Sequence, residues 1–141
     1  MPLSETVPPD LERRLAGLGD AIAAVAPDVR FAYVFGSTVA GRRTPRSDID
    51  LAIYVSDQAD ALTVRLAVAY AAAKHLGTDA VDVVVLNSAP IALAGRVLAS
   101  RQVVLERAPF TRHRYESLIA RMFQDFRIRE HRLLAERRAR G

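Results

Sequence analysis

The chain has 141 residues, half of them apolar, which is enough for one globular domain with a buried core. It has no cysteine, and this excludes a disulfide framework, a thiolate metal site and a cysteine nucleophile. The net charge is +4, and nineteen of the twenty basic residues are arginine, which permits a nucleotide, RNA or acidic-protein partner.

No apolar run approaches the ~20 residues that a helix needs to cross a bilayer. Residues 1–5 also lack the basic-then-apolar layout of a signal peptide. We therefore expect a cytoplasmic protein.

Helices and strands alternate along the sequence, as the spacing of apolar residues indicates. In chain order, the sequence first predicts a helix over 11–26 that begins after Asp10, a strand over 30–35, a turn at 36–37 with a short helix up to Gly41, and a polar loop over 42–47. A strand over 49–55 follows, and then a helix over 58–76 that Ser56 or Asp57 caps and Gly77 ends. The last predicted elements are a strand over 81–86, a helix from Pro90 to about 99, an edge strand over 101–106 and a long helix over 110–138. The alternation predicts a single α/β (α+β) domain with a small mixed sheet flanked by helices and a core over about 28–107.

Two carboxylates stand two residues apart, at Asp48 and Asp50, where the second strand begins. Side chains at i and i+2 of a strand project from the same face, so these carboxylates repel each other unless a cation lies between them. Magnesium prefers carboxylate and phosphate oxygens, and two such ions clamp the attacking and leaving oxygens of an in-line displacement. The pair therefore predicts a metal-dependent phosphoryl-transfer site.

Asp82 is the third candidate, because it interrupts a run of valines that predicts a strand buried on both faces. If this strand neighbours the second one, Asp82 completes the metal site or accepts the proton of the nucleophile. The alternative is an ordinary Asp at the first exposed position of a strand.

A small-residue turn at Gly36-Ser37 precedes the acidic pair by ten residues. Glycine allows close approach of the backbone to a ligand, and Ser37 offers a hydroxyl and an N–H to phosphate. Arg42, Arg43 and Arg46 flank this turn and can neutralise a triphosphate, and Ser47 can bind the nucleotide; each of them is equally compatible with a plain surface loop.

The pattern Gly36-Ser37, ten residues, Asp48-x-Asp50 and then Asp82 on a following strand resembles the DNA polymerase β-like nucleotidyltransferase superfamily. The similarity is greatest to its minimal nucleotidyltransferase (MNT) branch, where residues 47–51 and 81–90 also look alike. The segments 114–116 and 124–126 resemble the C-terminal helix of MntA-type antitoxins.

This resemblance implies a nucleotidyltransferase fold and a defined chemistry. Many such proteins are antitoxins of a HEPN-domain ribonuclease toxin, and active members transfer AMP from ATP to a toxin tyrosine, releasing pyrophosphate. It implies that Asp48 and Asp50 bind two Mg²⁺, that Asp82 binds one and helps to deprotonate the tyrosine, and that Gly36 and Ser37 hold the ATP phosphates. The basic last helix is a candidate partner-binding element.

Two other functions fit the same sequence. An antitoxin can neutralise its partner by stoichiometric binding, through the Arg- and Glu-rich last helix, without catalysis. A nucleotidyltransferase can also act on a small molecule or an RNA end, although the sequence contains no obvious second domain for such an acceptor.

Overall fold

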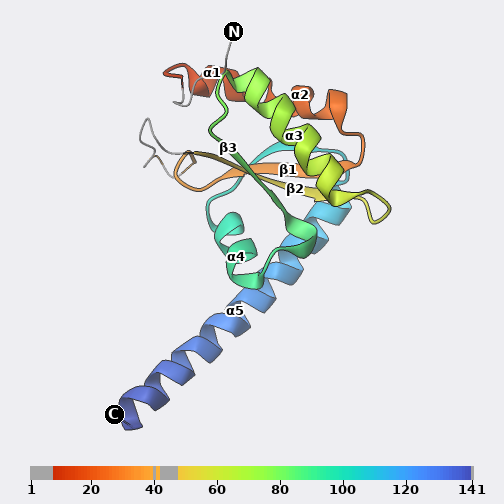
Figure 1. The fold of residues 1–141 in the computed structure, drawn as a ribbon. Helices are drawn as coiled ribbons and strands as arrows, with labels where there is room; N and C mark the ends of the chain where they lie inside the picture. The colour runs from red at the N-terminus through yellow and green to blue at the C-terminus, as the bar shows by residue number, and fades with distance from the viewer. Residues whose placement is uncertain (1–7, 40, 42–47, 141) are drawn as a thin grey trace.

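The computed structural model describes residues 8–39, 41 and 48–140 of the chain. Within these residues the elements are α1 (Leu11–Leu15), α2 (Leu18–Val25), β1 (Val29–Phe35), β2 (Ile49–Val55), α3 (Ala61–Leu76), β3 (Val81–Val85), the 3₁₀ helix η1 (Leu86–Ser88), α4 (Ile91–Ala99), β4 (Gln102–Glu106) and α5 (Pro109–Arg140). The strands form one sheet in the order β3-β2-β1-β4 (Figure 1). β1 is antiparallel to β2 and to β4, while β2 and β3 are parallel, so the predicted mixed sheet is confirmed.

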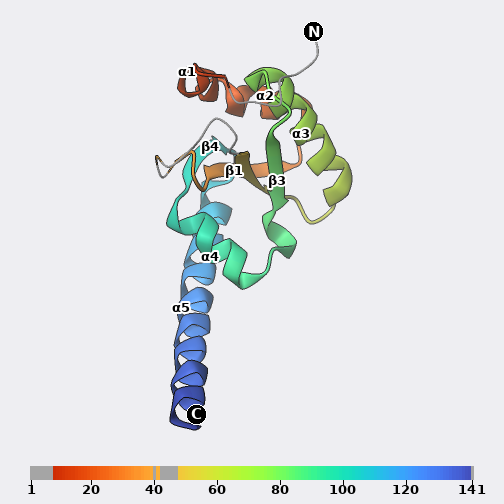
Figure 2. The same cartoon turned by 60° about the vertical axis from the view of Figure 1, so that its left-hand side comes forward.

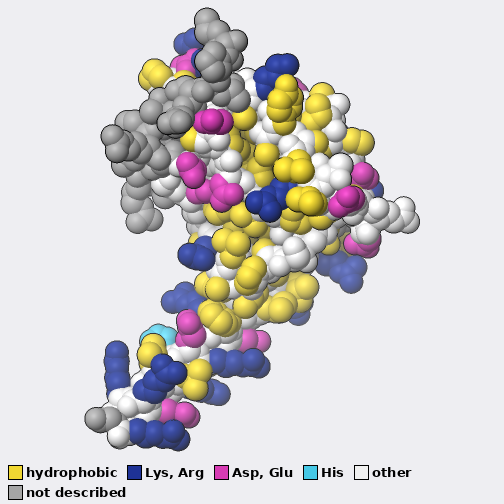
Figure 3. Space-filling model, in the orientation of Figure 1, with side chains coloured by type: hydrophobic (Ala, Val, Ile, Leu, Met, Phe, Trp, Pro, Cys, Tyr) yellow, Lys and Arg dark blue, Asp and Glu magenta, His cyan; other side chains and the backbone are white. Residues whose placement is uncertain are grey.

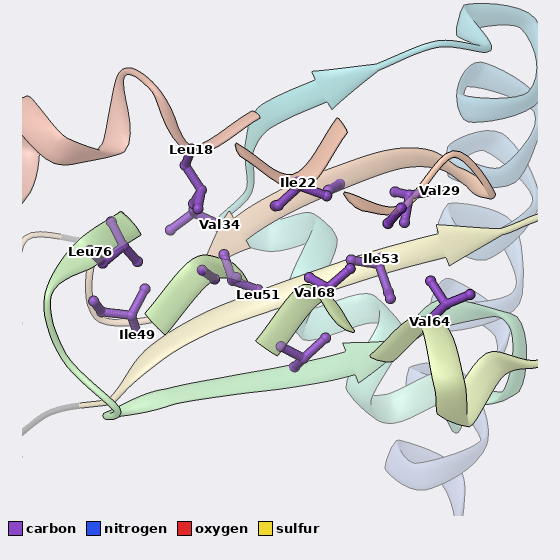
Figure 4. Packing of buried hydrophobic residues seen from close by; sticks show 14 of the residues in the cluster. Leu18, Ile22, Val29, Val34, Ile49, Leu51, Ile53, Val64, Val68 and Leu76 are labelled. Atoms are coloured by element: carbon purple, nitrogen blue, oxygen red, sulfur yellow. The ribbon is translucent and has the colours of Figure 1, made fainter. Parts of the chain in front are cut away.

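Helices cover both faces of this sheet (Figure 2). Because successive side chains of a strand point to opposite faces, β1 contributes Ala32 and Val34 to one core and Phe31, Tyr33 and Phe35 to another. The first core lies under α2 and α3, where the labelled side chains of Figure 4 pack together. The second lies under α4 and the first half of α5. The sheet is therefore the middle layer of three.

The predicted first helix is divided into α1 and α2 at Ala16-Gly17, which corrects the single helix expected over 11–26. At this break the backbone passes so close to α3 that a Cβ on Gly17 would lie 2.9 Å from the ring of His75. His75 donates from Nε2 to the carbonyl oxygen of Arg14, 2.7 Å away. Tertiary contact with α3 therefore overrides the helical spacing of the apolar residues.

Two helix starts also differ from the prediction. Residues 36–39 form turns in place of a short helix. α3 follows Asp60, so neither Ser56 nor Asp57 caps it, and the Ser56 hydroxyl instead donates to Asp28 at 3.1 Å. The predicted end of α3 is confirmed: Gly77 adopts a φ of +75°, the left-handed conformation that favours glycine.

β3 is an edge strand, which corrects the expectation that its valines are buried on both faces. Val83 is buried, Asp82 is exposed, and the other residues of the strand are half-buried. Val81, Val83 and Val85 pack on the core under α3 and Val84 packs on the other core, and β-branched residues suit an edge strand as well as a central one. β4 occupies the opposite edge, as predicted.

α5 packs on the body only through its first half (Figure 1). Tyr115 and Ile119 are buried against the second core, and Phe123 and Phe126 are half-buried. Every described residue from 127 to 140 is exposed, and the helix projects away from the sheet there. The predicted apolar stripe of α5 therefore packs on its own chain only in part. None of the described helices is long and apolar enough to cross a membrane.

Candidate active site

Asp50 and Asp82 lie side by side on the face of the sheet that α4 covers. Parallel pairing of β2 with β3 places Asp82 in register with Asp50. Their strand neighbours Ile49, Leu51 and Val83 point to the opposite face, into the core under α3. The strand that carries Asp82 is therefore a neighbour of the strand that carries Asp50, as the predicted site requires.

Asp48 stands directly before β2 and is exposed. It lies two positions before Asp50 in the sequence, so strand alternation directs both side chains toward the same face. The three candidate acids therefore lie near the first residues of β2 and β3.

The electrostatics of this cluster are unfavourable for three free carboxylates. Burial raises the pKa of the Asp50 carboxyl above its ordinary value, and the negative charges of Asp82 and Asp48 raise it further. A bound cation would relieve this repulsion, because opposite charge stabilises the ionised form.

The donor set suits a hard cation, although its side chains do not converge on one point. Among residues 8–39, 41 and 48–140, no three Asp, Glu, His or Cys side chains are grouped closely enough to hold an ion. Asp48 and Asp82 are exposed, so their side chains are free to rotate and could turn carboxylate oxygens, the ligands that Mg²⁺ prefers, toward a cation placed beside Asp50. The residues present therefore fit Mg²⁺ in chemistry and charge.

Gly36 touches the acidic cluster directly. It follows Phe35, which pairs with Asp50 across β1 and β2. Its φ is +78°, and a Cβ at this position would lie 2.6 Å from Oδ2 of Asp50. Only glycine allows both the left-handed backbone and the close approach of the carboxylate. The backbone N–H of Gly36 donates to the Ser100 hydroxyl at 3.0 Å, which joins the turn to the end of α4.

A cleft of about 650 Å³ opens between this turn and α4. It is lined by Phe35, Gly36, Ser37, Asp50, Leu93, Arg96, Ala99 and Ser100. Its volume lies within the usual range for small-molecule sites, and it brings the predicted turn and one predicted acid to one wall. A ligand in this cleft would touch Gly36, Ser37 and Asp50 together.

α4 supplies two cleft residues that the sequence analysis missed, Arg96 and Ser100. Arg96 is exposed, and no described residue forms an ion pair or a side-chain hydrogen bond with its guanidinium. Residues 93, 96 and 100 stand at helical spacing and share one face, and this spacing is visible in the sequence. Which face of the sheet that helix covers is decided by tertiary packing, so the spacing alone could not identify them.

The remaining predicted residues lie outside the described part of the chain. These are Arg42, Arg43, Arg46 and Ser47, all within 42–47. Their roles stay predictions.

The family model for polymerase beta nucleotidyltransferases matches residues 20–110, which include both strands of the acidic cluster, the turn and α4. No curated protein matches the sequence. Solved structures with a similar fold include two toxin–antitoxin structures. A toxin–antitoxin crystallised with AMP-PNP is 24% identical with a TM-score of 0.68, and the match covers 89% of this chain and 96% of the other. In the structure of the tri-AMPylated Shewanella oneidensis HEPN toxin in complex with MNT antitoxin, one chain is 21% identical with a TM-score of 0.66. The match covers 89% of this chain and 97% of the other.

Proposed function

Since the chain belongs to the polymerase beta nucleotidyltransferase family, we propose that it transfers AMP from ATP to a tyrosine hydroxyl of a HEPN-type ribonuclease toxin. It thereby acts as the antitoxin of that toxin. The reaction needs Mg²⁺ and releases pyrophosphate.

The observation that carries this proposal is the pairing of Asp50 with Asp82 on the cleft side of the sheet. Asp50 and Gly36 line the same cleft, so a triphosphate bound at the turn lies against Asp50. Asp50 is partly buried in the cleft and two neighbouring negative charges raise its pKa, and a carboxylate in such a position marks a site for chemistry more often than a structural role.

Magnesium, when held by Asp48, Asp50 and Asp82, would neutralise the phosphate charge and so make the α-phosphorus easier to attack. Gly36 and Ser37 hold the phosphates at the turn, and Arg96 on α4 offers a guanidinium to them from the other wall.

The transfer is a single displacement at the α-phosphorus of ATP. The tyrosine oxygen forms a bond to this phosphorus while the bond to the α,β-bridging oxygen breaks, and pyrophosphate leaves with the bonding electrons. The proton of the hydroxyl passes to the carboxylate of Asp82, which is exposed and accessible to a protein acceptor.

The fold relatives support the choice of nucleotide and of acceptor. One of them was crystallised with the ATP analogue AMP-PNP, and another complex contains a HEPN toxin that carries three AMP groups. The projecting half of α5 has six arginines and two glutamates over residues 127–140, and we propose that it is the element that binds the partner.

The exposed half of α5 also favours a second candidate function, stoichiometric neutralisation without transfer. Its charged surface lies outside the residues that the family model matches, so binding does not require the acidic cluster. The two functions differ in whether the acids are needed.

Neutralisation in cells separates these two candidates. The protein encoded beside this chain is expressed with the unaltered chain, with Asp48→Asn/Asp50→Asn, or with Asp57→Asn/Asp79→Asn, whose two acids are exposed and outside the cleft. We expect the first double change to abolish rescue of growth and the second to leave it intact. Rescue by Asp48→Asn/Asp50→Asn would support the stoichiometric binder instead.

A further inference from the structure

A groove of about 470 Å³ runs along β3 on the outside of the sheet, and we refer to it as the edge groove. It is lined by Ala61, Leu62, Arg65, Asp82, Val83, Val84, Val85, Ser88, Ala89, Pro90 and Leu93. It therefore joins the start of α3, the strand that carries the third acid, and the start of α4.

β3 is the last strand of the sheet, and no described residue pairs with its outer edge. An edge strand presents N–H and C=O groups to any extended chain that comes alongside. The edge groove follows this unpaired backbone.

An apolar row on α3 continues the groove. Leu62, Leu66 and Tyr70 stand four residues apart, so they share one face of the helix. Their exposed fractions are 61%, 61% and 69%, and Figure 3 shows apolar side chains gathered over α3 on the same face of the body as acidic ones. A contiguous exposed apolar row of this kind is typical of an interaction surface.

One wall of the edge groove is held in place before anything binds. Asn87 of η1 accepts a hydrogen bond from the backbone N–H of Val55 at 3.0 Å and donates to the Val55 carbonyl at 2.9 Å. These bonds fix η1 to the end of β2, so the residues that follow β3 form a preformed wall.

The edge groove and the cleft meet at the acidic cluster. Leu93 lines both, Asp50 faces the cleft, and Asp82, its partner in register, faces the groove. A group held in the groove beside Asp82 is therefore next to a nucleotide held in the cleft.

We propose that the edge groove binds an extended segment of the acceptor protein, which adds to β3 as a further strand and carries the tyrosine that is modified. The inference rests on the proposed function, because it names where that acceptor docks. Main-chain hydrogen bonds to β3 give affinity, and alternate side chains of the segment give specificity.

Strand alternation also fixes what the segment must contain. Val81, Val83 and Val85 face the α3 side of the sheet, and Asp82 faces the α4 side. In an added strand, a tyrosine directed to the Asp82 side has both of its sequence neighbours directed to the α3 side, toward Leu62 and Leu66. The acceptor tyrosine therefore lies between two apolar residues.

The test uses the full chain in a preformed complex with its proposed HEPN-type partner. Leu62→Glu/Leu66→Glu is compared with Val103→Glu/Phe110→Glu, which places one charge on β4 at the opposite edge of the sheet and one at the start of α5, both on exposed apolar positions. We expect the first pair to slow single-turnover transfer by about tenfold or more and the second to leave it unchanged. Affinity for AMP-PNP stays unchanged in both, because neither pair lines the cleft.

Hydrogen exchange supplies the second readout, since strand addition protects those backbone amides of residues 81–85 that point away from β2 when the partner binds. If the unaltered chain transfers AMP but Leu62→Glu/Leu66→Glu is equally fast, or these amides gain no protection, the groove is not the docking site and the proposed function stands. If the unaltered chain transfers nothing to its bound partner, the proposed function fails and the inference fails with it.

Discussion

At the scale of single residues, Gly36 is the most constrained position of the site. A Cβ there would lie 2.6 Å from Oδ2 of Asp50, whereas a Cβ on Gly41, which also has a positive φ of +71°, meets no atom of the described residues within 4 Å. Substitutions at these two glycines therefore distinguish the effect of backbone strain from the effect of contact with Asp50.

We predict that Gly36→Ala and Gly41→Ala each lower the free energy of unfolding by about 1 kcal/mol, because both place Cβ in a left-handed residue. Only Gly36→Ala displaces the Asp50 carboxylate, so it alone lowers the transfer rate, by about a hundredfold. Thermal unfolding and single-turnover transfer measure the two effects. Equal loss of transfer in both variants would contradict this role of Gly36.

Arg96 gives a second prediction at this scale. Its guanidinium lines the cleft and has no ion-pair partner among the described residues, so it is available to phosphate. Arg96→Gln should weaken AMP-PNP binding about tenfold, since a charge-assisted hydrogen bond contributes about 1.5–3 kcal/mol, and Arg96→Lys should recover part of it. Arg30→Gln, an exposed arginine of β1 outside the cleft, is the matched control in the titration. An unchanged affinity in Arg96→Gln would exclude the contact.

At the scale of elements, a partly buried carboxylate joins α5 to the sheet. Glu116 accepts hydrogen bonds from the Tyr33 hydroxyl at 2.7 Å, from Nη1 of Arg112 at 2.8 Å and from Nη2 of Arg101 at 3.1 Å. Burial alone raises the pKa of Glu116, but the hydrogen bonds from Tyr33 and Arg112 and the charge of Arg101 outweigh it and lower the pKa below its ordinary value.

A lowered carboxyl pKa stabilises the fold above the pKa of the unfolded chain, about 4.3, and this contribution is lost as the pH falls through the folded value. We predict that Glu116→Gln lowers the free energy of unfolding by about 2 kcal/mol at pH 7, and that the difference from the unaltered chain shrinks as the pH falls below about 4.3. Urea unfolding over a series of pH values from 7 downward measures this. Glu130→Gln, exposed on the same helix, should leave the free energy of unfolding unchanged throughout the series; a difference for Glu116→Gln that stays constant as the pH falls would argue against an electrostatic origin.

The elements differ in how far local sequence determines them. Asp48 and Asp50 share a face because a strand alternates, and Gly77 ends α3 because its backbone is left-handed, so both were predictable. The register of Asp82 with Asp50 depends on the order of the strands in the sheet, which the sequence did not determine. Arg96 and the break at Gly17 depend on which helix packs where, and no local pattern contains that information.

At the scale of the whole molecule, the chain consists of a layered body and a projecting helix. The family model covers the body as far as the start of α5, and every described residue beyond 126 is exposed. The chemistry and the proposed partner surface are thus on separate parts of one chain.

Removal of residues 127–141 tests this division. Since no described residue of the segment is buried, we predict a change in the free energy of unfolding of about 0.5 kcal/mol or less and an unchanged affinity for AMP-PNP. Affinity for the HEPN-type partner should fall about tenfold or more, because the segment carries the basic surface. Calorimetric titration with each ligand measures both. A shortened chain that binds the partner normally would move the interface onto the body.

The central claim is that Asp48, Asp50 and Asp82 transfer AMP to a protein tyrosine, and the intact mass of the partner tests it most directly. The partner is incubated with ATP, Mg²⁺ and either the unaltered chain, Asp48→Asn/Asp50→Asn or the matched Asp57→Asn/Asp79→Asn. We predict that the partner gains the mass of one or more AMP groups on tyrosine with the unaltered chain and the matched control, and gains none with Asp48→Asn/Asp50→Asn. An unmodified partner in a complex that forms with the unaltered chain, or equal modification by Asp48→Asn/Asp50→Asn, would contradict the account.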